Sequence, residues 1–365
     1  MIHLIYPHRP RISAPDVIGA TLLRELSKQN DVVAHDFDRM YAIDPRPGDV
    51  LIGHAHPIAT TVFRRSARRA GWGRRILLEP FNADWRQVGF IDDVIDRCDL
   101  FLAITGRHWF RHDEGPTARW KPKMIHVDLA IDREAFPRVR AVVSPPGRRK
   151  ILYIGNDHPG KNLPYLDAIA GAWAGGTIDW IGRGPPLQHV RSLGFVDFSS
   201  EAGRRIVADY DFLITVGKAD ANPTTILEAM SWGLTPICTP TSGYVDEEAI
   251  FNVPNDDVAG TCAILDGLQK IDEAELLRRR AIGDRRLAEH YHWDRFVGQV
   301  RDAIASPASP PLPARNASAP PIPRGSITAT GKLVGRNLIY ELEHRWPALG
   351  LHGSVLTRAR NWMRR

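Results

Sequence analysis

The sequence predicts an α/β protein with two domains, each built on a parallel sheet. The chain has 365 residues, enough for two domains of about 150 residues each and a tail. Apolar runs of four or five residues alternate with longer helical patterns as far as about residue 300, which indicates repeated βα units. The stretch 138–149, with Pro145, Pro146 and Gly147, interrupts this alternation. We therefore expect two Rossmann-like domains, formed by residues 1–140 and 150–290.

Hydrophobic periodicity places the elements of the first domain. The expected strands are His3–Tyr6, Val32–Asp36, Val50–Ile52, Arg75–Leu78, Leu100–Ile104 and Lys123–Val127. The expected helices include Val17–Gln29, Ala59–Arg69 and Ile91–Arg97.

A second series of elements begins at Lys150. Its expected strands are Ile151–Ile154, Asp179–Ile181, Phe212–Val216 and Thr235–Cys238. Its expected helices include Leu163–Trp173, Ser200–Ala208, Thr225–Trp232 and Glu273–His290.

The C-terminal part of the chain differs in composition from the two domains. Residues 306–325 contain seven prolines in twenty positions, so 306–326 is predicted to be a linker. Within 327–365, the apolar side chains from Val355 to Met363 share one face of a basic amphipathic helix. Such a helix suits the anionic inner face of a membrane. It could equally pack on the body of the protein or solubilise a tail.

Charge and cysteine content exclude several classes of protein. Five of the six excess positive charges lie in the last 39 residues, so the remainder is nearly neutral and a nucleic-acid partner is not expected. The three cysteines form no CxxC motif, and we expect neither a metal nor a cofactor. The chain shows neither a signal-peptide pattern nor an apolar run of about 18 residues, which predicts a cytoplasmic protein.

The most informative stretch is Asp220-Ala-Asn-Pro-Thr-Thr-Ile-Leu-Glu228, which follows a buried strand. A helix is predicted to begin near Pro223, and its free N–H groups and positive dipole end would favour a phosphate. Glu228 could accept hydrogen bonds from a ribose diol, and Asp220 could hold sugar hydroxyls. Alternatively, Glu228 forms a cap or salt bridge and Asp220 is a turn residue.

This stretch resembles the donor site of the group 1 (family 4) retaining glycosyltransferases, which have the GT-B fold of two facing Rossmann-like domains. Their E-x7-E motif leads into EAM-x-x-G-x-P-V, and here Asp220 takes the first position. Other segments resemble family elements in the same order along residues 1–305. These segments are Val127–Phe136, Ile151–Asn162, Asp179–Pro185, Leu193–Val196, Tyr210–Phe212 and Tyr291–Trp293.

The resemblance implies a hexosyltransferase-like enzyme that moves a sugar from a nucleotide-sugar donor to a glycan, a lipid-linked saccharide or a polysaccharide with retention of configuration. The N-terminal domain would face the acceptor, and a crossing helix at about 291–305 would return to it. Lys161 would contact the diphosphate, Glu228 the ribose and Asp220 the transferred sugar, with no metal required. The full donor-binding set would be Gly155, Asn156, Lys161, Gly182, Arg183, Asp220, Pro223, Thr224, Thr225 and Glu228.

Two departures from the family concern single residues. The family pairs the Lys with an Arg early in the same loop, where this chain has Asn156 and His158. A family histidine at the end of an N-terminal strand corresponds here to the segment Glu79–Asp84. Asn82 could replace it, or His54 or His56 could reach the cleft. The candidate catalytic residues are therefore Asp220, Lys161, Asn82 and His56.

Two weaker hypotheses concern arginines and histidines of the N-terminal domain. Arg9 and Arg11 could approach the donor phosphate from across the cleft, or they could be solvated loop residues. The i, i+2 spacing of His54 and His56 suits a metal pair in an extended chain, but no third ligand is evident nearby.

Sequence motifs argue against two competing functions and leave two others open. The stretch Gly155–Asn162 approaches a P-loop, but Asn162 lacks the hydroxyl that a P-loop uses to bind Mg²⁺. No G-x-G-x-x-G follows a candidate first strand, which argues against dinucleotide-dependent redox chemistry. A nucleotide-sugar 2-epimerase of the same architecture and a non-catalytic binding or scaffold subunit remain as alternatives.

Overall fold

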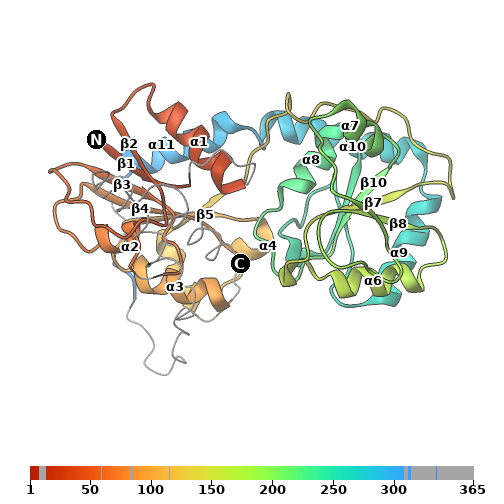
Figure 1. Cartoon of the computed structure of the whole chain (residues 1–365), viewed down its shortest axis with the longest axis horizontal. Helices are drawn as coiled ribbons and strands as arrows, with labels where there is room; N and C mark the ends of the chain where they lie inside the picture. The colour runs from red at the N-terminus through yellow and green to blue at the C-terminus, as the bar shows by residue number, and fades with distance from the viewer. Residues whose placement is uncertain are drawn as a thin grey trace, which may run out of the picture.

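The computed structural model describes residues 1–7, 14–58, 60–82, 85–114, 116–307, 311–313 and 334. It contains two sheets of six strands, which lie in two lobes along the long axis of the molecule (Figure 1). Every strand pairing in both sheets is parallel. The prediction of an α/β fold with two facing Rossmann-like domains is therefore confirmed.

The N-terminal sheet has the strand order β2-β1-β3-β4-β5-β6. Its central strands are fully buried because helices cover both faces, and their continuous apolar runs reflect this. The strands are β1 (Ile2–Ile5), β2 (Val32–His35), β3 (Val50–Gly53), β4 (Arg74–Pro80), β5 (Leu100–Ile104) and β6 (Met124–Val127).

Two layers of helices enclose the N-terminal sheet. On one face, α1 (Ala14–Leu26) packs beside α11 (Trp293–Ala305), as Figure 1 shows. The helices that follow β3, β4 and β5 contribute to the other face. They are α2 (Val62–Ser66), α3 (Trp85–Ile95), α4 (Arg107–Arg111) and α5 (Pro116–Trp120), with a 3₁₀ turn η1 (Lys121–Lys123) before β6.

The C-terminal sheet has the order β12-β11-β10-β7-β8-β9. Its strands are β7 (Ile151–Ile154), β8 (Ile178–Ile181), β9 (Arg191–Gly194), β10 (Phe212–Thr215), β11 (Thr235–Cys238) and β12 (Phe251–Asn252). The two edge strands, β9 and β12, are not among the strands expected from the sequence. β9 is largely exposed and β12 has only two residues, so neither carries a buried apolar run.

The C-terminal helices also form two layers. In Figure 1, α7, α8 and α10 lie on one side of the sheet and α6 and α9 on the other. Their bounds are α6 (Leu163–Ala172), α7 (Glu201–Ala208), α8 (Thr224–Trp232), α9 (Val258–Lys270) and α10 (Glu273–Glu289), with 3₁₀ turns η2 (Pro159–Lys161) and η3 (Pro240–Ser242).

One predicted helix is shorter in the structure. The prediction for 59–69 is observed as the five residues of α2. Thr61 is extended at the helix start, with φ −77° and ψ 163°. After Ser66 the chain tightens into i→i−3 hydrogen bonds, from Arg68 to Arg65 and from Arg69 to Ser66. The basic residues at the end of the predicted helix therefore lie in turns.

The chain passes between the lobes twice, and the two passages touch. After β6 the backbone N–H of Ile131 donates to the carbonyl of Tyr291 over 3.1 Å. The second passage leads into α11, whose residues Phe296, Val297 and Val300 are buried in the N-terminal core. No helix in the described part of the chain combines the length and the apolarity needed to cross a bilayer.

Candidate functional site

The candidate site lies where the strands β7, β8 and β10 end. In a parallel sheet all strands end at the same edge, so the loops that follow them meet there. The turns after β7 and β10 touch directly, because the backbone N–H of Lys218 donates to the carbonyl of Gly160 over 2.9 Å. The N–H of Gly155 likewise donates to Ile181 at the end of β8, over 3.1 Å.

Lys161 and Asp220 form an ion pair across this edge. The ammonium group of Lys161, on η2, donates to a carboxylate oxygen of Asp220 in the turn after β10. Both side chains are partly exposed, at 31% and 20%. His158 shapes the turn that carries the lysine, since its Nδ1 accepts from the N–H of Gly160 over 3.1 Å. The structure therefore brings together two residues that are 59 positions apart in sequence.

Helix α8 begins beside this ion pair. Pro223 is its N-cap, and no side chain caps its first turn. The backbone of Thr224 and Thr225 therefore presents N–H groups at the positive end of a nine-residue helix. This arrangement is suited to an anion such as a phosphate. The predicted helix start is thus observed within one residue.

Glu228 lies one turn into α8, with a half-buried side chain. Burial raises the pKa of its carboxyl to about 7, while a hydrogen bond from Thr224 and the positive charge of Lys161 act in the opposite direction. The three residues Lys161, Asp220 and Glu228 therefore interact electrostatically at a single edge of the sheet. A carboxyl with a pKa near 7 can accept or donate a hydrogen bond near neutral pH.

Two glycines of the predicted donor-binding set lie in crowded surroundings, and Gly182 allows the backbones after β7 and β8 to approach. A Cβ on Gly182 would lie 1.8 Å from the carbonyl oxygen of Gly155. A Cβ on Gly155 would lie 2.5 Å from the hydroxyl of Tyr153. Trp180 on β8 also holds the turn after β7 in place, because its Nε1 donates to the carbonyl of Gly155 over 2.8 Å. A side chain at Gly182 would therefore require a shift of the backbone, whereas one at Gly155 would require the Tyr153 ring to move.

The remaining donor-side predictions lie in exposed loops at the same edge. Arg183 is exposed, and its guanidinium lies 4.5 Å from the ring centroid of Phe195, which is 67% exposed. Asn156 is also exposed, and its side-chain oxygen accepts from the N–H of His158 over 3.2 Å.

Among the N-terminal candidates, Asn82 makes a direct contact with the loop between β10 and α8, residues 216–223, which carries Asp220 and is called the donor-side loop after the sequence prediction. Its Nδ2 donates to the carbonyl of Ala219, adjacent to Asp220, over 2.7 Å. His54 pairs with the buried Glu79 at 2.9 Å. The described contacts of His56 are within the N-terminal domain, including the edge of Phe37. Arg9 and Arg11 are outside the described residues, as is residue 84.

Sequence reasoning missed several residues that position this loop. Trp109 on α4 donates its Nε1–H to the carbonyl of Asp220 over 2.8 Å, and the N–H of Gly106 donates to Ala221 over 2.7 Å. On the other side, the N–H of Asp220 donates to Thr241 over 3.0 Å. No motif marks these contacts, because each uses a backbone atom of the loop.

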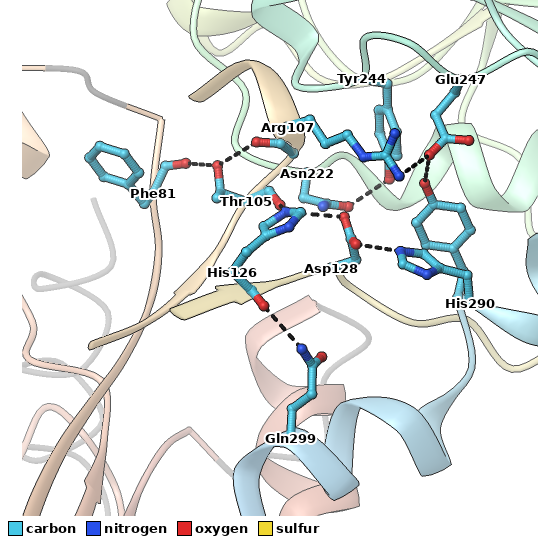
Figure 2. A network of polar contacts seen from close by, with 12 residues as sticks. Phe81, Thr105, Arg107, His126, Asp128, Asn222, Tyr244, Glu247, His290 and Gln299 are labelled. Carbon is cyan, nitrogen blue, oxygen red and sulfur yellow. Dashed lines mark hydrogen bonds and ion pairs between the residues drawn. The ribbon is translucent and has the colours of Figure 1, made fainter. Parts of the chain in front are cut away.

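A second polar cluster lies where the two passages between the lobes meet (Figure 2). The buried carboxylate of Asp128 contacts His290 at 2.6 Å and His126 at 3.4 Å. Burial alone would raise its pKa, but the hydrogen bonds with these histidines outweigh burial and hold the pKa of Asp128 well below its usual range. Among the described residues, no group of His, Cys, Asp and Glu has the arrangement of a metal site.

The sequence matches no protein-family model and no curated protein. Solved structures match it by fold. A sucrose-phosphate synthase from Thermosynechococcus elongatus has a TM-score of 0.60 at 12% identity, over 82% of this chain and 97% of that one. HepE from Anabaena, solved with UDP and glucose, has a TM-score of 0.57 at 11% identity, over 84% and 99%.

TarM from S. aureus has a TM-score of 0.51 at 9% identity and is matched over 71% of this chain. The chain spans 55% of the length of TarM. At these identities the likeness establishes the fold, which is the GT-B fold of glycosyltransferases.

The raised pKa of Glu228 predicts a pH-dependent stability. The unfolded carboxyl ionises near 4.5 and the folded one near 7, so the unfolded chain releases the proton first. Stability contributed by the protonated form is therefore present below pH 4.5 and is lost as pH rises through about 7. We expect the stability of the wild type relative to Glu228→Gln to fall by on the order of 1–3 kcal/mol between pH 5 and pH 7.5.

Urea unfolding at the two pH values measures this difference. Glu289→Gln, at an exposed position on α10, is the matched control and should keep the wild-type pH profile. Parallel profiles for the wild type and Glu228→Gln would contradict the prediction.

Proposed function

We propose that the protein is a glycosyltransferase that moves a sugar from a nucleoside-diphosphate sugar to a hydroxyl of a glycan, a lipid-linked saccharide or a polysaccharide, with retention at the anomeric carbon. The observation that carries this proposal is the convergence of Lys161, Asp220, Glu228 and the start of α8 on one edge of the C-terminal sheet. The fold shared with HepE, whose structure holds UDP and glucose, supports the same reading.

Each group at this edge suits one part of such a donor. The N–H groups at the start of α8 and the ammonium of Lys161 would bind the diphosphate. The carboxylate of Glu228 would accept hydrogen bonds from the ribose hydroxyls. Asp220 would accept from the hydroxyls of the transferred sugar. Gly155, Asn156, Gly182 and Arg183 would contribute the surrounding loops.

The chemistry consists of one substitution at the anomeric carbon. The bond between this carbon and the phosphate oxygen breaks, and its electron pair stays on the diphosphate. The acceptor hydroxyl attacks from the same face and its proton passes to the leaving phosphate oxygen. Lys161 and the dipole of α8 would stabilise the negative charge that develops there, without a metal ion. Closure of the two domains would exclude water and limit hydrolysis of the donor.

The N-terminal domain would bind the acceptor. Asn82 and His56 are the side chains that the sequence nominates on that side, and Asn82 already lies against the loop that carries Asp220. An acceptor linked to a lipid would be reached from the cytoplasmic face of the inner membrane. The basic segment 327–365, which lies outside the described residues except for position 334, would hold the protein there.

The proposed reaction is tested by the anomeric configuration of its product. UDP-, GDP- and ADP-sugars are first ranked by the thermal shift that each produces, because a ligand of the native state raises its stability. The best donor is then incubated with a panel of glycan acceptors in the presence of EDTA. We expect a glycoside with the donor's anomeric configuration in the NMR spectrum. An inverted product would refute retention, and loss of turnover in EDTA would refute transfer without a metal.

Replacement of Lys161 tests its contact with the diphosphate. Lys161→Ala should weaken binding of the corresponding nucleoside diphosphate by about 10- to 100-fold, the cost of one charge-assisted hydrogen bond. Isothermal titration calorimetry measures the Kd. Lys150→Ala is the matched control, since Lys150 is an exposed lysine just before β7, at the opposite end of the strand. Equal Kd values for Lys161→Ala and the wild type would exclude the assignment.

Deletion of residues 327–365 tests the membrane proposal. The segment carries seven Lys and Arg against two Glu, and it should bind anionic vesicles. We expect the full chain to co-sediment with phosphatidylglycerol vesicles and the truncated chain to remain in the supernatant. Vesicles of phosphatidylcholine alone are the control and should retain neither chain. Equal sedimentation of both chains with anionic vesicles would disprove the role of this segment.

A further inference from the structure

Three successive carbonyl groups of the donor-side loop accept hydrogen bonds from the N-terminal domain. Asn82 donates to Ala219 over 2.7 Å, Trp109 to Asp220 over 2.8 Å and the N–H of Gly106 to Ala221 over 2.7 Å. The methyl group of Ala219 also packs against the N-terminal core. The backbone on both sides of Asp220 is therefore held by residues of the other domain.

The donors of these bonds belong to one fixed platform. Asn82 follows β4, whereas Gly106 and Trp109 follow β5. Thr105 links the two segments, because its hydroxyl donates to the carbonyl of Phe81, next to Asn82 (Figure 2). The N–H of Phe81 in turn donates to Ile104 over 3.0 Å. The platform is buried, since Thr105 has no exposed surface and Trp109 is 8% exposed.

The C-terminal domain fixes the same residue from the other side. The N–H of Asp220 donates to the carbonyl of Thr241 over 3.0 Å, and its carboxylate pairs with Lys161. With the carbonyl of Asp220 bound by Trp109, both its peptide groups and its side chain are held. The position of this carboxylate therefore depends on contact between the domains. Glu228, by contrast, interacts with Thr224 and Lys161, which belong to the C-terminal domain.

We propose that Trp109 and Asn82 are positioning residues that place the carboxylate of Asp220 for the transferred sugar only when the N-terminal domain is in contact with the loop. This inference rests on the proposed function, because it takes Asp220 as the group that binds the sugar. The proposal assigns the two parts of the donor to different binding surfaces. The nucleoside diphosphate is bound by the C-terminal domain alone, whereas the sugar is aligned by the two domains together.

Trp109→Phe and Asn82→Asp test the proposal. The first removes the indole N–H and keeps an aromatic ring. The second has nearly the same shape but places an acceptor against the carbonyl of Ala219. Both variants should lower kcat by at least about tenfold, because small displacements of a binding group near the reacting carbon are costly. The Kd for the nucleoside diphosphate should stay within about twofold of the wild type.

Trp173→Phe is the matched control. Trp173 is also buried and donates its indole N–H to Asp266 over 2.9 Å, but it follows the end of α6 that is remote from Lys161. Its replacement also removes the hydrogen bond of a buried indole N–H, here to a carboxylate, and should leave kcat unchanged.

Hydrogen exchange of the free protein gives a readout that does not depend on activity. We expect faster deuterium uptake in the peptide 216–223 for Trp109→Phe and Asn82→Asp, but not for Trp173→Phe. An unchanged kcat in both variants, or a rise in Kd that matches the loss of kcat, would overturn the positioning role. If the wild type neither binds nor turns over any donor, the proposed function fails and this role fails with it. The exchange data then show only whether the contact forms.

Discussion

All twelve strands pair in parallel within their sheets, and the candidate site depends on this constraint. It collects the turns after β7, β8 and β10 at one edge, where residues far apart in sequence become neighbours. Lys161 and Asp220 meet there although 59 positions of sequence separate them. The N-terminal sheet obeys the same constraint, so the turns after β4 and β5 also gather at one edge. These two edges are the surfaces through which the domains touch.

The electrostatics of the site fits this placement. The ion pair of Lys161 and Asp220 is partly exposed, so it contributes little to stability and its partners can exchange it for a charged ligand. The raised pKa of the Glu228 carboxyl reflects the cost of burying a charge. Gly182 lies so close to the carbonyl of Gly155 that no side chain fits between the turns after β7 and β8.

Much of this arrangement could be predicted from the sequence. The buried strands carry continuous apolar runs, and Pro223 with the two following threonines marks the start of α8, so the α/β fold and the start of this helix were predictable. Edge strands β9 and β12 were not, because an exposed or two-residue strand has no apolar pattern. The contacts of Trp109 and Gly106 were also missed. They bind backbone carbonyls, which every residue possesses, so no sequence pattern could reveal them. The roles of Asn82 and His56 at the acceptor side stay predictions.

The path of the chain through α11 affects how the protein is made. This helix comes after the whole C-terminal domain in sequence, yet Phe296, Val297 and Val300 complete the apolar interior around β1 and β4. During synthesis the N-terminal domain emerges from the ribosome before α11, so α1 lacks its neighbour on this face of the sheet until about residue 305 has followed. The C-terminal domain can form its own interior earlier. The N-terminal domain is therefore completed after the C-terminal domain, and the apolar surface that α11 covers stays open in the interval.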